Sequence, residues 1–170
     1  MKKYLLIALV IILVVIFVPK QVDQTEINTE YQIATLAGGC FWCVEADLEK
    51  IPGVLEVISG YSGGTMENPT YKQVSSGKTA HTEAVQVYYD PNQTNYITIL
   101  DTFWKTHDPT DIEGQFVDRG QQYRPEIFYH TQEQLVIATE SKTALNNSNI
   151  FNTSIKTKIT PFTAFYNAEE

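Results

Sequence analysis

The chain has 170 residues, which suits one ordinary domain with a short extension. Its apolar fraction of 43% and charged fraction of 19% are those of a globular protein that buries a core without disulfide support. The formal net charge of −8 argues against nucleic acid as the main partner. The two cysteines and three histidines do not provide a second ligand pair for a closed structural metal site.

The first 30 residues differ from the rest of the chain. Met1-Lys2-Lys3 precedes an unbroken apolar run over 5–18, which ends at Pro19-Lys20. A signal peptide has this pattern, but no small-residue cleavage site follows the run. We therefore expect residues 1–19 to be an uncleaved signal anchor, with a cleaved signal peptide as the alternative. Because basic flanks stay in the cytoplasm, the domain would be membrane-anchored or secreted on the extracytoplasmic side, after a polar linker at 20–30.

Residues 31–170 form the predicted domain, in which strand and helix patterns alternate. Runs of β-branched and aromatic residues predict strands at 31–37, 54–61, 83–89, 127–129 and 155–159. Apolar residues at helical spacing, with capping and stop signals, predict helices at 41–50, 96–106 and 131–145. Two long irregular segments remain, at 62–80 (with a short turn at 71–75) and at 107–124. Loops of that length inside a compact domain are usually functional.

This order of elements predicts an α+β fold. The β-α-β-β-α-β order, followed by α-β, matches a ferredoxin-like α/β plait, a split βαβ core with an added helix and strand. In that architecture the helices cover one face of a single sheet. The two irregular segments are expected to converge near the start of the first helix.

The most informative stretch is Gly39-Cys40-Phe41-Trp42-Cys43, which opens the first predicted helix and holds both cysteines. A thiol at a helix N-terminus meets the positive end of the helix dipole, which favours the nucleophilic thiolate. The two aromatic residues behind Cys40 would form a small apolar pocket for part of a substrate. Taken alone, the stretch also fits two buried structural thiols or half of a zinc site.

Further motifs follow in order along the chain: Pro52-Gly53-Val54, Gly60-Tyr61-Ser62-Gly63-Gly64, Asn68-Pro69-Thr70-Tyr71, His81-Thr82-Glu83-Ala84-Val85, His107-Asp108-Pro109-Thr110 and Asp118-Arg119-Gly120-Gln121-Gln122-Tyr123-Arg124. With the cysteine motif, the ordered set resembles peptide methionine sulfoxide reductase of type A from about Ile33 onward. The resemblance implies a thiol-dependent peptide-methionine (S)-S-oxide reductase. Such an enzyme reduces methionine-S-sulfoxide, free or in proteins, and repairs proteins after oxidative stress.

The resemblance also implies roles for residues at matching positions. Cys40 would be the nucleophile that attacks the sulfoxide sulfur, and Glu83 the acid that protonates its oxygen. A glutamate does this near neutral pH only if burial raises its pKa. Tyr71 and Tyr123 would donate hydrogen bonds to the sulfoxide oxygen, and Asp118 would orient the polar network of the site.

Phe41 and Trp42 would enclose the substrate methyl group, because contact between sulfur and aromatic rings is favourable. No metal and no cofactor are expected. Attack should leave Cys40 as a sulfenic acid, and Cys43 is the only internal thiol that can resolve it to a disulfide. A thioredoxin-like protein would then reduce this pair, and direct reduction of the sulfenic acid by an outside thiol stays open.

Two other classes remain as alternatives. The Cys-x-x-Cys pair alone also fits a thioredoxin-like disulfide oxidoreductase, with Thr160-Pro161 as a weak counterpart of that class's proline loop. A non-catalytic anchored module that binds a metal or a partner is the second alternative. The expected partners are oxidised proteins or free methionine sulfoxide, a thioredoxin-like reductant and a membrane, and the chain is expected to be a monomer.

Overall fold

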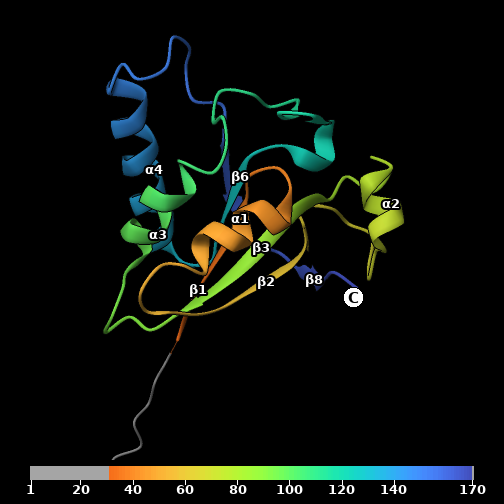
Figure 1. Ribbon diagram of the computed structural model, residues 1–170, viewed down its shortest axis with the longest axis horizontal. Helices are drawn as coiled ribbons and strands as arrows, with labels where there is room; N and C mark the ends of the chain where they lie inside the picture. Colours follow the sequence, from red (N-terminus) through yellow and green to blue (C-terminus); the bar gives the residue numbers. More distant parts are fainter. Residues whose placement is uncertain (1–30, 170) are drawn as a thin grey trace, which may run out of the picture.

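The computed structural model describes residues 31–169, shown in colour in Figure 1. The predicted anchor at 1–19 and the predicted linker at 20–30 lie outside the described residues. Among residues 31–169, no helix has both the length and the apolar character needed to cross a membrane.

A six-stranded sheet forms the centre of the structure, in the order β7-β6-β1-β3-β2-β8. Its strands are β1 (Gln32–Ala37), β2 (Val54–Ser62), β3 (Thr82–Tyr89), β6 (Glu126–Tyr129), β7 (Lys158–Pro161) and β8 (Phe165–Asn167). Adjacent strands are antiparallel except for β6 and β7, which are parallel. A separate two-stranded hairpin consists of β4 (Gly114–Gln115) and β5 (Asp118–Arg119).

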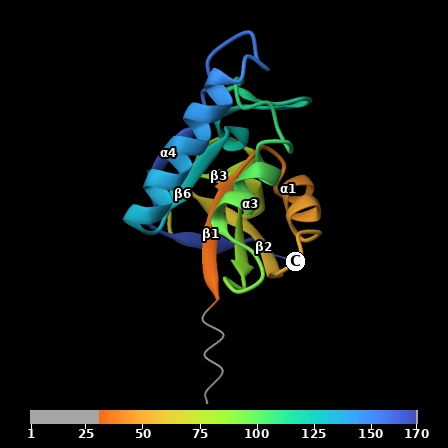
Figure 2. The ribbon, with the colours of Figure 1, turned by 90° about the vertical axis from the view of Figure 1, so that its left-hand side faces the viewer.

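The helices are α1 (Phe41–Leu48), α2 (Tyr71–Ser75), α3 (Tyr96–Phe103) and α4 (Gln132–Asn147), with a 3-10 turn, η1 (Gln121–Tyr123). Leu36 of β1 and Val85 of β3 are paired residues that point into one large core cluster. Side chains of α1 and α3 and Ala138 of α4 fill the same cluster, so these three helices share one face of the sheet. Figures 1 and 2 show α3 beside α4, where Trp104 Nε1 donates to Ser141 Oγ at 2.8 Å. The predicted α+β fold is confirmed.

Local sequence signals explain where the longer helices begin. Asn95 accepts a hydrogen bond from the Thr98 backbone N–H, and Thr131 accepts one from the Gln134 N–H, as expected for N-cap residues. Cys40 is the N-cap of α1, but its side chain makes no capping hydrogen bond. The Cys40 thiol is therefore not used to support the helix.

The last part of the chain differs from the prediction. The expected strand at 155–159 lies instead at Lys158–Pro161, and the unpredicted strand β8 pairs with the edge of β2. Gly60 lies opposite Asn167 in this pairing, and a side chain on Gly60 would collide with the Tyr166 carbonyl. The absence of a side chain at Gly60 therefore allows β8 to approach, a contact that no local pattern in β8 reveals.

Arg124 and Glu126 form a buried ion pair at the start of β6. The Arg124 Nε donates to the Glu126 carboxylate at 2.8 Å, and the two side chains are only 11% and 6% exposed. The guanidinium also donates to the carbonyls of Ala80 and Gln121, and the Thr160 hydroxyl donates to the other Glu126 oxygen. The pair thus joins β6 to β7 and to the segment that precedes β3.

We expect Glu126→Ala to lower the free energy of unfolding by roughly 3–5 kcal/mol, because it leaves the Arg124 charge buried without its partner. Urea denaturation measures the change. Asp47→Ala is the matched control, since it breaks the exposed Lys50–Asp47 pair and should cost less than about 1 kcal/mol. Equal losses in the two variants would contradict the prediction.

Candidate active site

Cys40 lies at the turn that leads from β1 into α1. Gly39 has a φ of 98°, a backbone conformation that residues with side chains rarely adopt. A Cβ on Gly39 would also lie 2.7 Å from the Gln115 side chain, so glycine is required here. The Cys40 carbonyl accepts from the backbone N–H of Cys43 at 3.1 Å and of Val44 at 3.3 Å, and these bonds begin the helix.

The helix N-terminus does not lower the pKa of Cys40 overall. Burial raises this pKa above its ordinary value of 9.0, and the backbone N–H groups of Cys43 and Trp42 lower it by less. The neighbouring Cys43 thiol raises it further. The start of the helix thus favours the thiolate, as expected, but burial outweighs this effect, so Cys40 of the free protein is a thiol at neutral pH.

Glu83 lies on β3 beneath the first turn of α1. Its side chain is 2% exposed, and its Oε2 accepts a hydrogen bond from the Phe41 backbone N–H at 3.2 Å. Burial raises the pKa of Glu83 to about 7, although the Phe41 N–H lowers it, and the Asp118 charge raises it further. The carboxyl therefore keeps its proton in part of the molecules at neutral pH, and the protonated form is the one that a general acid needs.

Three aromatic rings lie against one another beside Cys40, and they differ in how deeply they are buried. Phe41 is 1% exposed and belongs to the core, whereas Trp42 is 60% exposed and Tyr71 is 38% exposed. The rings of Trp42 and Tyr71 stack with centroids 6.0 Å apart, and the Phe41 ring lies 5.0 Å from that of Trp42. Phe41 thus lies in the core, and the rings of Trp42 and Tyr71 are open to solvent above it.

The remaining predicted residues come from the two long irregular segments. Burial raises the pKa of Tyr123 to about 12, with further contributions from the charges of Glu83, Tyr71, Asp118 and Cys40. Burial, followed by Glu83, Cys40 and Asp118, likewise raises the pKa of Tyr71. Both tyrosine hydroxyls are therefore protonated donors at neutral pH. The structure thus places five predicted residues near one another: Cys40, Tyr71, Glu83, Asp118 and Tyr123.

Cys43 lies one turn into α1 and is exposed, and both cysteines are free thiols. Glu45, in the same helix, accepts a hydrogen bond from the Ser59 hydroxyl and so ties α1 to β2. In the part of the chain that the structure describes, no group of three or more His, Cys, Asp and Glu side chains is arranged to hold a metal ion.

Sequence reasoning missed residues that hold the site loops in place. Glu169 accepts a hydrogen bond from the Tyr71 backbone N–H at 2.7 Å and one from the Tyr61 hydroxyl at 3.3 Å. Gln115 accepts from the Asp108 N–H at 2.8 Å and donates to the Asp108 carbonyl at 3.0 Å. Glu169 bonds to a backbone group far away in the sequence, and Gln115 bonds to the backbone of a loop. Neither kind of contact produces a pattern in the spacing of residues along the sequence.

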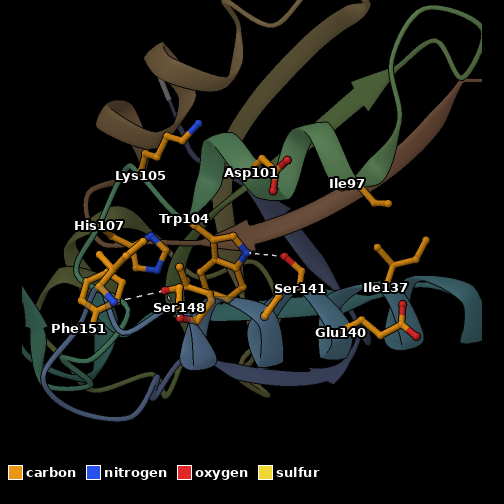
Figure 3. Close-up of a pocket in the computed structure, with 13 residues that line it drawn as sticks. Ile97, Asp101, Trp104, Lys105, His107, Ile137, Glu140, Ser141, Ser148 and Phe151 are labelled. Atoms are coloured by element: carbon orange, nitrogen blue, oxygen red, sulfur yellow. Dashed lines mark hydrogen bonds between the residues drawn. The ribbon is translucent and has the colours of Figure 1, made fainter.

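A large cavity lies away from these residues, between α3 and α4 (Figure 3). Its volume is about 920 Å³, and its lining includes Trp104, Ile137 and Phe151. His107 also lines it, and burial lowers the pKa of His107 to about 4, so this imidazole is neutral. None of the predicted site residues lines this cavity.

Comparisons with known proteins identify the family of the chain. A family model described as peptide methionine sulfoxide reductase matches residues 32–170. The peptide methionine sulfoxide reductase MsrA/MsrB of Vibrio cholerae is 54% identical over 152 residues, which cover 89% of this chain and 40% of that relative. The chain thus spans less than half the length of that relative. MsrA 2 of Staphylococcus aureus is 50% identical over 82% of this chain and 78% of the relative.

Solved structures of the same family are also similar. Reduced Mxr1 of Saccharomyces cerevisiae has a TM-score of 0.71 at 32% identity, over 82% of this chain and 81% of that one. Methionine sulfoxide reductase A of Corynebacterium diphtheriae has a TM-score of 0.72 at 30% identity, over 82% and 70%. The chain therefore belongs to the peptide methionine sulfoxide reductase family, and the predicted enzyme class is confirmed.

Proposed function

We propose that this chain reduces methionine-S-sulfoxide, free or within a polypeptide, with Cys40 as the nucleophile. The observation that carries the proposal is a partly buried thiol at the start of α1 beside a buried carboxyl whose pKa is about 7. The Cys40 thiolate attacks the sulfoxide sulfur and forms a bond between the two sulfurs, while Glu83 gives its proton to the oxygen. The hydroxyl group then moves from the substrate sulfur to the Cys40 sulfur, and the bond between the two sulfurs breaks to release the thioether. The substrate sulfur is reduced by two electrons and Cys40 is oxidised to a sulfenic acid.

The surrounding residues support this transfer in the proposed reaction. The hydroxyls of Tyr71 and Tyr123 donate hydrogen bonds to the sulfoxide oxygen while its negative charge grows. Burial keeps the pKa of Glu83 raised, and the charge of Asp118 raises it further, so that a proton is available near neutral pH. Trp42 contacts the substrate methyl group, above the buried ring of Phe41.

Recycling uses the second cysteine in this proposal. The Cys43 thiol condenses with the Cys40 sulfenic acid, releases water and leaves a disulfide, which a thioredoxin-like dithiol reduces. A solved complex of Saccharomyces cerevisiae Mxr1 with Trx2, similar to this chain with a TM-score of 0.55 at 26% identity, supports such a partner. Disulfide exchange by the purified protein without any sulfoxide would favour the thioredoxin-like alternative instead.

We further infer that β6, β1, β3 and β2 are the core of a ferredoxin-like plait. Their order and their antiparallel pairing support this description, with β7 and β8 as additions at the two edges.

The protons of the site generate one prediction. The reactive form needs Cys40 deprotonated and Glu83 protonated, and kcat/KM for methionine-S-sulfoxide should rise with pH and level off near 7. It should fall again above the pKa of Cys40. In Glu83→Gln the inflection near 7 should vanish, so that the rate keeps rising up to the Cys40 pKa. The rate at pH 7 should be lower by roughly 10²–10⁴-fold, the usual loss of a general acid.

Steady-state assays of both epimers over a pH series measure this, with Cys40→Ser as the inactive control. If Glu83→Gln matches the parent at every pH, Glu83 is not the acid. Activity in Cys40→Ser, or equal use of the R epimer, would refute the proposed function.

A second prediction concerns Cys43. One equivalent of sulfoxide without reductant should leave the parent two hydrogens lighter by intact mass, with no titratable thiol. Cys43→Ser should release a single methionine per protein and then stall with a thioredoxin-type reductant, while a small dithiol restores turnover. A stable sulfenic acid in the parent, with Cys43 still titrating as a thiol, would show that Cys43 does not resolve it.

We also propose that residues 1–19 anchor the chain with its domain on the extracytoplasmic side. The support is the basic start and the apolar run of the sequence. Protease added to cells stripped of any outer barrier should digest the domain, and a cytoplasmic marker protein should survive as the control. Survival of the domain together with the marker would mean that the proposed placement is wrong.

A further inference from the structure

The β4–β5 hairpin presents two apolar side chains to solvent. Phe116 is 81% exposed and Val117 is 91% exposed, and neither belongs to a core cluster of the described residues. Phe116 has a φ of 51°, an unfavourable backbone conformation for a bulky side chain. Backbone strain of this kind persists only where the surroundings impose it, and it is common at functional sites. Folding alone does not explain why these two positions are apolar.

The base of the hairpin holds its tip in a fixed position. The Arg119 guanidinium donates to both oxygens of Asp111, at 2.6 and 3.3 Å. The buried Gln115 side chain bonds to the backbone of Asp108 and donates to the Asp111 carbonyl at 3.2 Å. The Gly120 N–H closes the loop by donating to the Glu113 carbonyl at 2.6 Å. Phe116 and Val117 therefore stand on a rigid support.

This support adjoins the site. The Gln115 side chain packs against Gly39, the residue before Cys40, and Figure 1 shows the 107–124 segment beside the turn into α1. Asp118, on the second strand of the hairpin, is close enough to act on the Glu83 carboxyl. When the oxidised side chain of an extended polypeptide reaches Cys40, each neighbouring residue lies about 3.3 Å further along that polypeptide. Those neighbours can reach the hairpin tip.

We propose that Phe116 and Val117 form a docking surface for the polypeptide around a methionine sulfoxide, in particular for apolar side chains that flank the oxidised residue. The inference rests on the proposed function and names the substrate class of the same site. Oxidation makes a core methionine polar and disrupts the packing around it, which exposes apolar neighbours. Such a segment buries its apolar side chains against the hairpin tip.

The test compares a double variant, Phe116→Asn with Val117→Ser, with the parent, using a small dithiol as reductant. Asparagine tolerates the positive φ at this position. The substrates are free methionine-S-sulfoxide, a short peptide with leucine on both sides of the sulfoxide, and the same peptide with serine flanks. The kcat/KM for the leucine peptide should fall at least about tenfold, mainly through KM, because burying one apolar side chain corresponds to roughly one or two factors of ten in affinity.

Free methionine sulfoxide should be turned over at the parent's rate, and the serine peptide should change little. Ile150→Ser is the matched control, since Ile150 is 71% exposed in the segment after α4 and lines the distant α3–α4 cavity. It should leave all three substrates unaffected. Equal losses on free and peptide substrates, or no loss on the leucine peptide, would overturn the proposal. A loss that appears only when thioredoxin replaces the small dithiol would also overturn it, since the surface would then serve the reductant.

Binding separates this inference from the proposed function. Fluorescence anisotropy of a labelled leucine peptide, measured on Cys40→Ser and on Cys40→Ser with the double variant, reports docking without turnover. Weaker binding in the variant supports docking even if the parent fails to reduce sulfoxide. Equal binding overturns the docking surface even if the parent is active.

Discussion

The hydrogen bond from the Phe41 backbone N–H to the Glu83 carboxyl is the contact on which the site depends. It joins the first turn of α1 to β3, a central strand of the sheet. Because Cys40 precedes Phe41 directly, this bond holds Glu83 near Cys40. The bond also limits the penalty of burying a carboxyl, because it favours the charged form while burial favours the neutral one. Their balance leaves the pKa of Glu83 near neutrality, and the sharp turn at Gly39 allows α1 to start there.

The same burial acts on both reacting groups in the free protein. It raises the pKa of Cys40 as well as that of Glu83, so most molecules hold a proton on the thiol at neutral pH. A thiol is a poor nucleophile and resists oxidation better than a thiolate. Cys40 of the free protein is therefore expected to react slowly with electrophiles other than the substrate. Reactivity in the proposed mechanism depends on a substrate oxygen that accepts the Glu83 proton at the moment of attack.

Sequence patterns were enough for the parts of the fold that local chemistry determines. The caps at Asn95 and Thr131 and the run of β-branched and aromatic residues in β3 placed their elements within a few residues. The β4–β5 hairpin and β8 have only two or three residues a strand, too few for a periodic pattern. Likewise, the motif set led to Cys40 and Glu83, but the part of Glu169 in holding Tyr71 depends on a backbone contact that no motif contains.

The two cysteines differ in exposure, and this difference predicts which sulfur of the proposed disulfide the reductant attacks. As free thiols, Cys43 is exposed and Cys40 is partly covered, and we expect a Cys40–Cys43 disulfide to keep this difference. Access favours attack by a reducing thiolate at Cys43, although the raised pKa of Cys40 makes Cys40 a poor leaving group. In the proposed cycle, a proton from Glu83, whose carboxyl accepts the Phe41 N–H at the start of α1, offsets that disadvantage when Cys40 departs. In this proposal, Glu83 supplies a proton twice: once when the substrate is reduced, and once when the disulfide opens and Cys40 becomes a thiol again.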